Sequence, residues 1–249
     1  MHRFIVSTEE IIKGEVILQG DEFIHLQRVL RLGADEIIAL FDGKGIECIG
    51  KVESINTEAA VISIIKCSKN LRESPLELWL MQGLPKGDKM DLIIQKCTEL
   101  GIKGVVPLIM SRSDVKIPAD KQNEKVKRWK RIATEAAKQC GRTAVPLIQP
   151  VSSLKLALQN LPKHKVLIVP WEKANLPLHR VLDEQEDLSY SNAPVYITIG
   201  PEGGLTEEEI SLICEFGGSP VSIGPRILRT ETAAIAVTAL LMARWGDLG

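Results

Sequence analysis

Short apolar runs separated by turn residues fill the first seventy residues of the chain. Strands are expected over residues 3–6, 15–18, 37–41, 46–49 and 59–64, because each run is apolar or rich in β-branched side chains. Segments such as 42–45 (Asp-Gly-Lys-Gly) provide turns between them. A short helix is expected over 22–31, where Phe23, Leu26, Val29 and Leu30 fall on one side. So many short strands predict a small β-barrel.

The pattern changes after residues 69–75, a polar segment that ends in Pro75 and is the expected linker. This division predicts one domain at residues 1–70 and a second at 71–249. In the second, apolar strands over 76–81, 105–109, 166–169, 195–199 and 221–223 alternate with helices over 88–100, 121–140 and 230–245 and with one that starts after Thr206. Such alternation predicts an α/β fold with a mostly parallel sheet that helices cover on both faces.

Ligands of parallel sheets bind outside the carboxyl ends of the strands, which directs attention to the loops at 170–172, 200–204 and 224–229. The loop at 200–204 (Gly-Pro-Glu-Gly-Gly) contains the glycines that let a backbone approach a ligand closely. It does not fit GxGxxG, and GxxxxGK[ST] does not occur, which disfavours a dinucleotide or nucleoside triphosphate. A tight turn without a ligand is the alternative, but a second such loop at 224–229 favours a binding site.

Composition is that of an ordinary globular protein, with 45% hydrophobic residues and a net charge of -1 over 249 residues. No apolar run reaches membrane-spanning length, and the first residues do not resemble a signal peptide, so a cytoplasmic protein is expected. Residues 121–142 contain eight Lys or Arg and two acids, whereas 172–215 contain ten acids and two bases. This asymmetry favours a polyanionic partner on one face, with a solvated helix face as the alternative.

The cysteines and histidines are dispersed along the chain. Five cysteines without a CxxC pair predict neither a disulfide nor a zinc site, and the four histidines form no metal-ligating pattern. We therefore expect no bound metal.

Several segments together resemble one family. The pair 199–206 (IGPEGGLT) and 223–233 (IGPRILRTETA) is similar to the cofactor loops of the RsmE family, the 16S ribosomal RNA uracil-N3 methyltransferases of the SPOUT class. The similarity extends to 25–31 (HLQRVLR), 86–90 (KGDKM), 95–101 (QKCTELG), 111–113 (SRS) and 134–142 (TEAAKQCGR). It therefore spans nearly the whole chain.

The resemblance implies a PUA-like RNA-binding β-barrel at 1–70 and a SPOUT α/β domain with a trefoil knot at 71–249. It implies S-adenosylmethionine as the cofactor and 16S rRNA or the small ribosomal subunit as the partner of a homodimer, with no membrane and no metal. The expected cofactor-binding residues are Trp171, Glu172, Ile199, Gly200, Glu202, Gly203, Gly204, Ile223, Gly224, Pro225, Leu228, Arg229, Thr230 and Thr232. Trp171 has packing in the core as its alternative role, and Glu202 that of an exposed turn residue.

Two residues are catalytic candidates. Methylation at uridine N3 leaves negative charge on N3, O2 and O4 once the proton is removed, and the guanidinium of Arg229 is suited to stabilise it. Glu231 is expected to orient Arg229 or to act as a base, although acids at a helix start also serve as partners of the helix dipole.

Basic residues are the candidates for RNA contact, because phosphate contacts position the substrate. The expected set is Arg3, Arg28, Arg31, Lys86, Lys89, Arg112, Lys138 and Arg142. Other functions that fit the pattern are an RNA-binding module without catalysis, a SPOUT methyltransferase acting on another RNA or on a ribose hydroxyl, and a nucleotide-dependent enzyme.

Overall fold

A computed structural model describes residues 1–69, 72–115, 117–184 and 193–249. The chain forms two compact units, of which the first contains Met1–Glu73 and Ala137–Val145 and the second contains Ser74–Ala136 and Pro146–Gly249. The predicted boundary lay between residues 70 and 71, and those two residues are outside the described part of the chain. The first unit thus extends to Glu73 and also takes a segment from the middle of the sequence.

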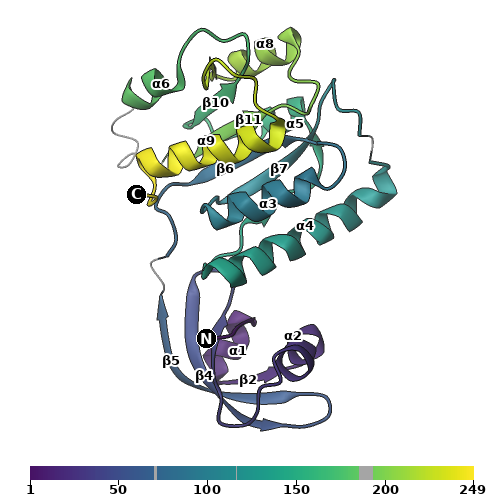
Figure 1. Cartoon of the computed structure of the whole chain (residues 1–249), viewed down its shortest axis with the longest axis vertical. Helices are drawn as coiled ribbons and strands as arrows, with labels where there is room; N and C mark the ends of the chain where they lie inside the picture. Colours follow the sequence, from purple (N-terminus) through teal and green to yellow (C-terminus); the bar gives the residue numbers. More distant parts are fainter. Residues whose placement is uncertain (70–71, 116, 185–192) are drawn as a thin grey trace. The chain divides into compact units, whose positions relative to one another are not determined.

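The N-terminal unit is built on a curled five-stranded sheet (Figure 1). Its strand order is β1 (Arg3–Ile5), β3 (Ile37–Phe41), β4 (Ile46–Ile55), β5 (Ala60–Lys69) and β2 (Glu15–Leu18), and only β1 and β3 pair in parallel. Phe4, Ile38, Leu40 and Ile62 point inward from their strands and form a buried core together with Leu26, which lies outside the sheet. β4 and β5 are longer than the apolar runs predicted.

The helices of this unit differ from the prediction. In place of one helix over 22–31, α2 (Gly20–Ile24) continues into a π-helical turn, η1 (His25–Val29). Helix α1 (Thr8–Lys13) was not predicted, although Ser7 and Glu10 form the capping box that marks its start.

One prediction about the cysteines was wrong. Cys48 and Cys67 form a disulfide, because the antiparallel pairing of β4 with β5 places these residues directly opposite each other. Their separation of 19 residues in the sequence carries no signal of this pairing. Cys97, Cys140 and Cys214 are free.

Ion pairs attach the segment Ala137–Val145 to the N-terminal unit. The carboxylate of Glu73 accepts hydrogen bonds from the Arg142 guanidinium at 2.7 Å and from the backbone N–H groups of Thr143 at 2.8 Å and Ala144 at 2.9 Å. The Arg3 guanidinium donates to Glu47 at 2.8 Å and to the Arg142 carbonyl at 2.9 Å. This segment is therefore a structural part of the first unit.

The C-terminal unit contains the predicted parallel sheet. Its order is β12 (Gly218–Val221), β10 (Val166–Pro170), β11 (Val195–Ile199), β6 (Leu78–Gly83), β7 (Gly104–Ile109) and β8 (Leu147–Ile148), and these neighbouring strands pair in parallel. The short β9 (Ser152–Ser153) pairs with β7. β12 lies earlier than the predicted strand at 221–223, so Ile223 belongs to the loop that follows it.

Helices cover both faces of this sheet. Trp79 and Met81 of β6 pack in one core with α5 (Leu154–Gln159) and α8 (Glu207–Glu215). On the opposite face, α3 (Lys89–Glu99) and α9 (Thr230–Trp245) lie side by side, and Cys97 contacts Thr238 there (Figure 1). Among the described residues the unit also contains α6 (Leu178–Glu184) and most of α4 (Ala119–Cys140). The trefoil knot implied by the resemblance stays a prediction.

Within the described ranges, no helix combines the length and the apolar character needed to cross a bilayer.

Candidate cofactor and active site

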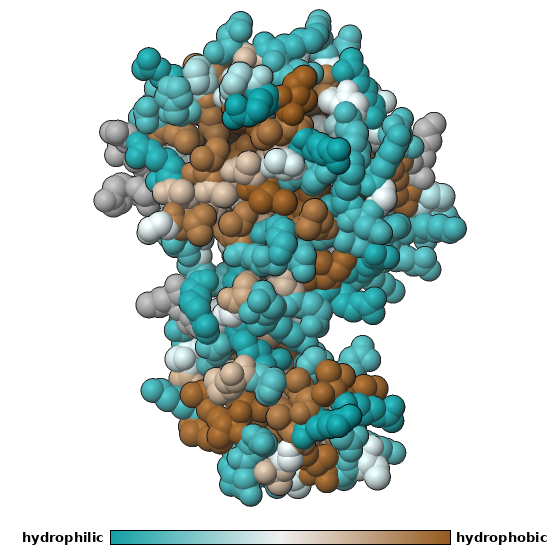
Figure 2. Space-filling model, viewed as in Figure 1, coloured by the Kyte–Doolittle hydropathy of each residue, from teal (hydrophilic) through white to brown (hydrophobic). Residues whose placement is uncertain are grey.

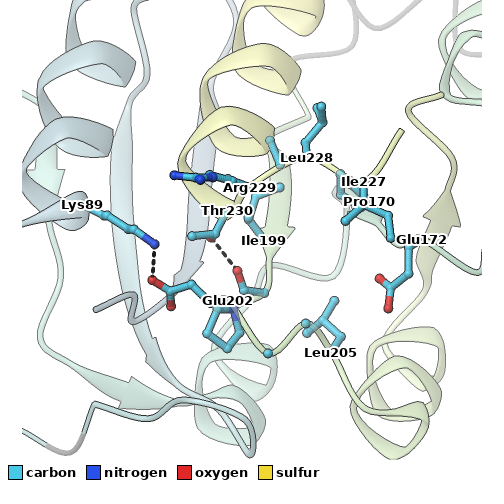
Figure 3. A pocket seen from close by; sticks show the side chains of 15 residues that line it. Lys89, Pro170, Glu172, Ile199, Glu202, Leu205, Ile227, Leu228, Arg229 and Thr230 are labelled. Carbon is cyan, nitrogen blue, oxygen red and sulfur yellow. Dashed lines mark hydrogen bonds and ion pairs between the residues drawn. The ribbon is translucent and has the colours of Figure 1, made fainter. Parts of the chain in front are cut away.

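The carboxyl ends of the central strands open into a cavity of about 410 Å³ (Figure 3). Loops that follow β10 and β11 and the loop before α9 meet around it, as the strand-end rule predicts. Its lining residues are Lys89, Pro170, Glu172, Ile199, Gly200, Pro201, Glu202, Gly203, Gly204, Leu205, Ile227, Leu228, Arg229, Thr230 and Ala233.

A second cavity of about 120 Å³ adjoins the first and shares Pro170, Glu172, Ile227, Leu228 and Ala233 with it. Its other walls include Trp171, Ile223, Gly224 and Pro225. The two cavities together bring thirteen of the fourteen expected cofactor residues to one place. Thr232 is the exception, because it is exposed on α9 and lines neither cavity.

Close backbone packing explains two of the glycines. A Cβ atom at Gly83, the last residue of β6, would lie 2.7 Å from the backbone nitrogen of Pro201. A Cβ atom at Gly203 would lie 2.8 Å from the Cβ of Arg112, whose guanidinium donates to the Gly203 carbonyl at 3.1 Å. The loop at 200–204 is thus held against its neighbours by contacts that leave no room for a side chain.

A buried polar chain connects the strand ends with the start of α9. Gln82 is fully buried, and its amide donates to the hydroxyl of Thr230 at 2.9 Å, which in turn donates to the Gly200 carbonyl at 2.6 Å. Gln82 was not among the predicted residues. The available signal in the sequence was Gln82 itself, a single polar residue at the end of the apolar run 78–81. A polar group buried at that position needs a hydrogen-bond partner.

Charged groups form the wall of the cavity nearest α3. The ammonium of Lys89 lies 2.7 Å from a carboxylate oxygen of Glu202 and 3.8 Å from one of Glu231. Burial raises the pKa of Glu202, but hydrogen bonds from Lys89 and from backbone N–H groups outweigh it, so that the pKa lies below its ordinary value. Glu202 is therefore a carboxylate at neutral pH.

Arg229 lies at the N-cap of α9 and is exposed. In Figure 3 its side chain extends to the same side of the cavity as Lys89 and Glu202. Its guanidinium has no side-chain partner in the part of the chain that the structure describes. Arg229 is therefore available to a ligand in the cavity.

The residues expected to contact RNA fall into different environments. Arg28 and Arg31 are exposed on the N-terminal unit. Lys86 pairs with Asp114 at 2.6 Å, Lys89 lies in the cavity, and Arg112 holds the glycine loop.

Three members of that set point inward, and for them the structure argues against RNA contact. The Arg142 side chain is only 7% exposed and pairs with Glu73, while Arg3 pairs with Glu47. Lys138 pairs with Glu22. The sequence showed that these residues are charged, but it did not show that their side chains are largely buried in ion pairs.

Comparison with known proteins first defines the class. Residues 72–242 match the model of the RNA methyltransferase domain, and residues 18–65 match that of the RNA methyltransferase PUA domain. The first match covers most of the C-terminal unit and also includes the segment Ala137–Val145, and the second lies within the N-terminal unit. A PUA domain joined to an α/β methyltransferase domain is the architecture expected from the sequence.

Individual relatives then define the family. The chain is 34% identical to ribosomal RNA small subunit methyltransferase E of Bacillus subtilis, over 88% of this chain and 86% of that protein. A crystal structure of ribosomal RNA small subunit methyltransferase E from Neisseria gonorrhoeae, bound to S-adenosyl methionine, is 32% identical, covers both chains fully and has a TM-score of 0.89. A Legionella pneumophila methyltransferase in complex with the same cofactor is 33% identical over 94% of this chain and 93% of that chain, with a TM-score of 0.80. The chain belongs to the ribosomal RNA small subunit methyltransferase E family, the RsmE family.

Proposed function

We propose that this protein methylates N3 of a uridine in 16S rRNA of the small ribosomal subunit, with S-adenosylmethionine as the methyl donor. The observation that carries the proposal is the cavity at the strand ends, where the glycine loop and the loop ending at Arg229 meet in a chain of the RsmE family. Arg229 provides a free cation beside the space in which a base would be methylated.

The residues around the cavity fit this cofactor. About 410 Å³ is a typical size for a small-molecule site. The apolar side chains of Ile199, Leu205 and Leu228 and the exposed backbone of the glycine loop suit a nucleoside, and Glu202 is a carboxylate able to accept hydrogen bonds from a ribose. The bound cofactor supplies an electrophilic methyl group on a sulfonium.

The chain's own residues have a separate task in the reaction. N3 lies on the Watson–Crick edge, so the uridine must be unpaired or extruded to reach the cavity. Its N3–H is a weak acid, and the site must stabilise the charge that remains at N3, O2 and O4. Arg229 performs this task, because a guanidinium at the wall of a partly enclosed site stabilises developing negative charge.

A substitution at Gly83, which packs against the glycine loop, tests the cofactor site. In Gly83→Ala the new methyl group meets the Pro201 backbone, so the loop must shift and S-adenosylmethionine should bind at least about tenfold more weakly, or about 1.4 kcal/mol. Gly33→Ala is the control, because its Cβ would meet nothing within 4 Å. Isothermal titration calorimetry measures both. Absence of binding by the unaltered protein at millimolar cofactor would contradict the proposed function itself.

The proposed homodimer has an apolar surface on the C-terminal unit. A groove of about 580 Å³ is lined by Leu178 and Leu182 of α6, by Leu240 of α9 and by the loop 222–225, which also borders the smaller cofactor cavity. Figure 2 shows brown, hydrophobic surface around α9 and α6. Burial of this groove between two copies would place the site near the interface. Leu240→Glu should shift sedimentation toward monomer, and a monomeric unaltered protein would contradict the proposal.

The proposed compartment is the cytoplasm, where the small subunit is available as substrate, and recovery of the native protein in a secreted fraction would contradict it.

RNA binding is proposed for the N-terminal unit through Arg28 and Arg31. Replacing Arg28 and Arg31 together should weaken RNA binding and flatten its salt dependence by about two phosphate contacts. An unchanged salt slope in filter binding would remove them from the interface.

A further inference from the structure

Lys89 occupies a position that local helix energetics disfavour. It is the first residue of α3, where the positive end of the helix dipole repels a cation. Residues that break a local rule are often found at functional sites. The sequence suggested a phosphate contact for Lys89, but the structure places its side chain in the wall of the cavity.

Two carboxylates fix the ammonium of Lys89 in this wall. Glu202 lies 2.7 Å away and is itself held by the backbone N–H of Lys86 at 3.0 Å. Glu231 lies at 3.8 Å, and its nearer oxygen, Oε2, is buried without a hydrogen-bond partner in the described residues. Glu231 lies two residues after Arg229 in the sequence, yet its carboxylate approaches Lys89. This contact differs from the expectation that Glu231 orients Arg229.

We infer that Lys89 is a second catalytic cation, which contacts a carbonyl oxygen of the uracil while Arg229 stabilises the other side of the anion, and that Glu231 is a positioning residue acting through Lys89. The inference rests on the proposed function. Negative charge on the base spreads over O2, N3 and O4, so two cations at one cavity stabilise it better than one. Figure 3 shows Lys89 and Arg229 on the same side of the cavity.

The reaction balances with the groups named. The proton of N3 passes to solvent, and the nitrogen lone pair forms the new bond to the methyl carbon. The carbon–sulfur bond breaks with its electron pair left on sulfur, so the cationic donor becomes neutral and one proton is released. Lys89 takes no part in this proton transfer and acts by stabilising charge on the oxygen.

Lys89→Met tests this role, since methionine keeps the length of the side chain without its charge. We expect kcat to fall about 10²-fold and the dissociation constant for S-adenosylmethionine to change less than about twofold. Lys96→Met is the matched control, because Lys96 lies on the same helix, pairs with Glu99 at 2.9 Å and is outside the cavity. An unchanged kcat with weakened cofactor binding would overturn the inference, because Lys89 would then bind the cofactor's own carboxylate.

RNA transcribed with 5-fluorouridine provides a readout that a structural role would not change. Its N3 proton is more acidic, so the anion needs less stabilisation and the ratio of unaltered to Lys89→Met kcat should become smaller. An equal ratio for both RNAs would overturn the catalytic role.

Glu231→Gln as a single substitution should lower kcat, but it should lower kcat little further in the Lys89→Met background. Full additivity of the two effects would overturn the role of Glu231 as a positioning residue.

Failure of the inference and failure of the proposed function give different results in these assays. If the unaltered protein transfers no methyl group to N3, the proposed function fails. If it does so and Lys89→Met retains its kcat, only the role of Lys89 fails.

Discussion

Arg229→Ala is expected to lower kcat by about 10²- to 10³-fold while the dissociation constant of S-adenosylmethionine changes less than about twofold. The reason is that the guanidinium has no side-chain partner among the described residues, so its removal leaves the folded site unchanged. The substitution removes the stabilisation of negative charge on the uracil, and this charge forms only when the N3 proton leaves. Single-turnover methyl transfer at saturating cofactor measures this step.

Arg244→Ala is the matched control for Arg229. It lies in the last turn of the same helix, pairs with Asp183 at 3.6 Å and lines neither cavity. Its kcat should therefore stay close to that of the unaltered protein. If Arg229→Ala retained near-normal turnover, or lost cofactor affinity in proportion to its rate, Arg229 would have no catalytic role.

Glu73→Ala should destabilise the N-terminal unit by about 3 kcal/mol. The substitution removes the ion pair with the nearly buried Arg142 guanidinium and the hydrogen bonds that the backbone N–H groups of Thr143 and Ala144 donate to this carboxylate. A loss of this size corresponds to about a hundredfold faster hydrogen exchange in β3 to β5. Glu58→Ala, at an exposed turn position, is the control. Unchanged exchange rates would mean that the segment 137–145 does not stabilise the unit.

The same pair predicts a dependence of stability on pH. Burial raises the pKa of Glu73, but hydrogen bonds from Arg142 and the backbone outweigh it and hold the pKa below its ordinary value. A group with a lowered folded pKa stabilises the fold above its unfolded value, about 4.3, and that contribution is lost as pH falls through the folded pKa. Exchange in the unaltered protein should therefore accelerate below about pH 4.3 relative to Glu73→Ala. Parallel pH profiles would contradict this linkage.

Elements with strong local signals were predicted well from the sequence. The helix over 230–245 was predicted with the observed bounds of α9, and the capping box of Thr206 and Glu209 forms at the start of α8. Apolar strand runs and capping residues act through neighbours in the chain, which is why they can be identified from the sequence. The same holds for the three strand-end loops that form the cavity.

Features that depend on pairing between distant segments were missed. The disulfide of Cys48 with Cys67 requires the register of β4 against β5, and the place of Ala137–Val145 requires Glu73. Lys89 illustrates the same limit within the site. Its charge was visible in the sequence, but its role depends on carboxylates more than one hundred residues away.

Nucleoside mass spectrometry of unmethylated small-subunit RNA tests the central claim most directly. The RNA, free or in the subunit, is incubated with the protein and S-adenosylmethionine and then digested to nucleosides. The account predicts N3-methyluridine as the product, formed by the unaltered protein and about 10²-fold or more slowly by Arg229→Ala. A ribose-methylated nucleoside, or methylation of transfer RNA in place of small-subunit RNA, would contradict it.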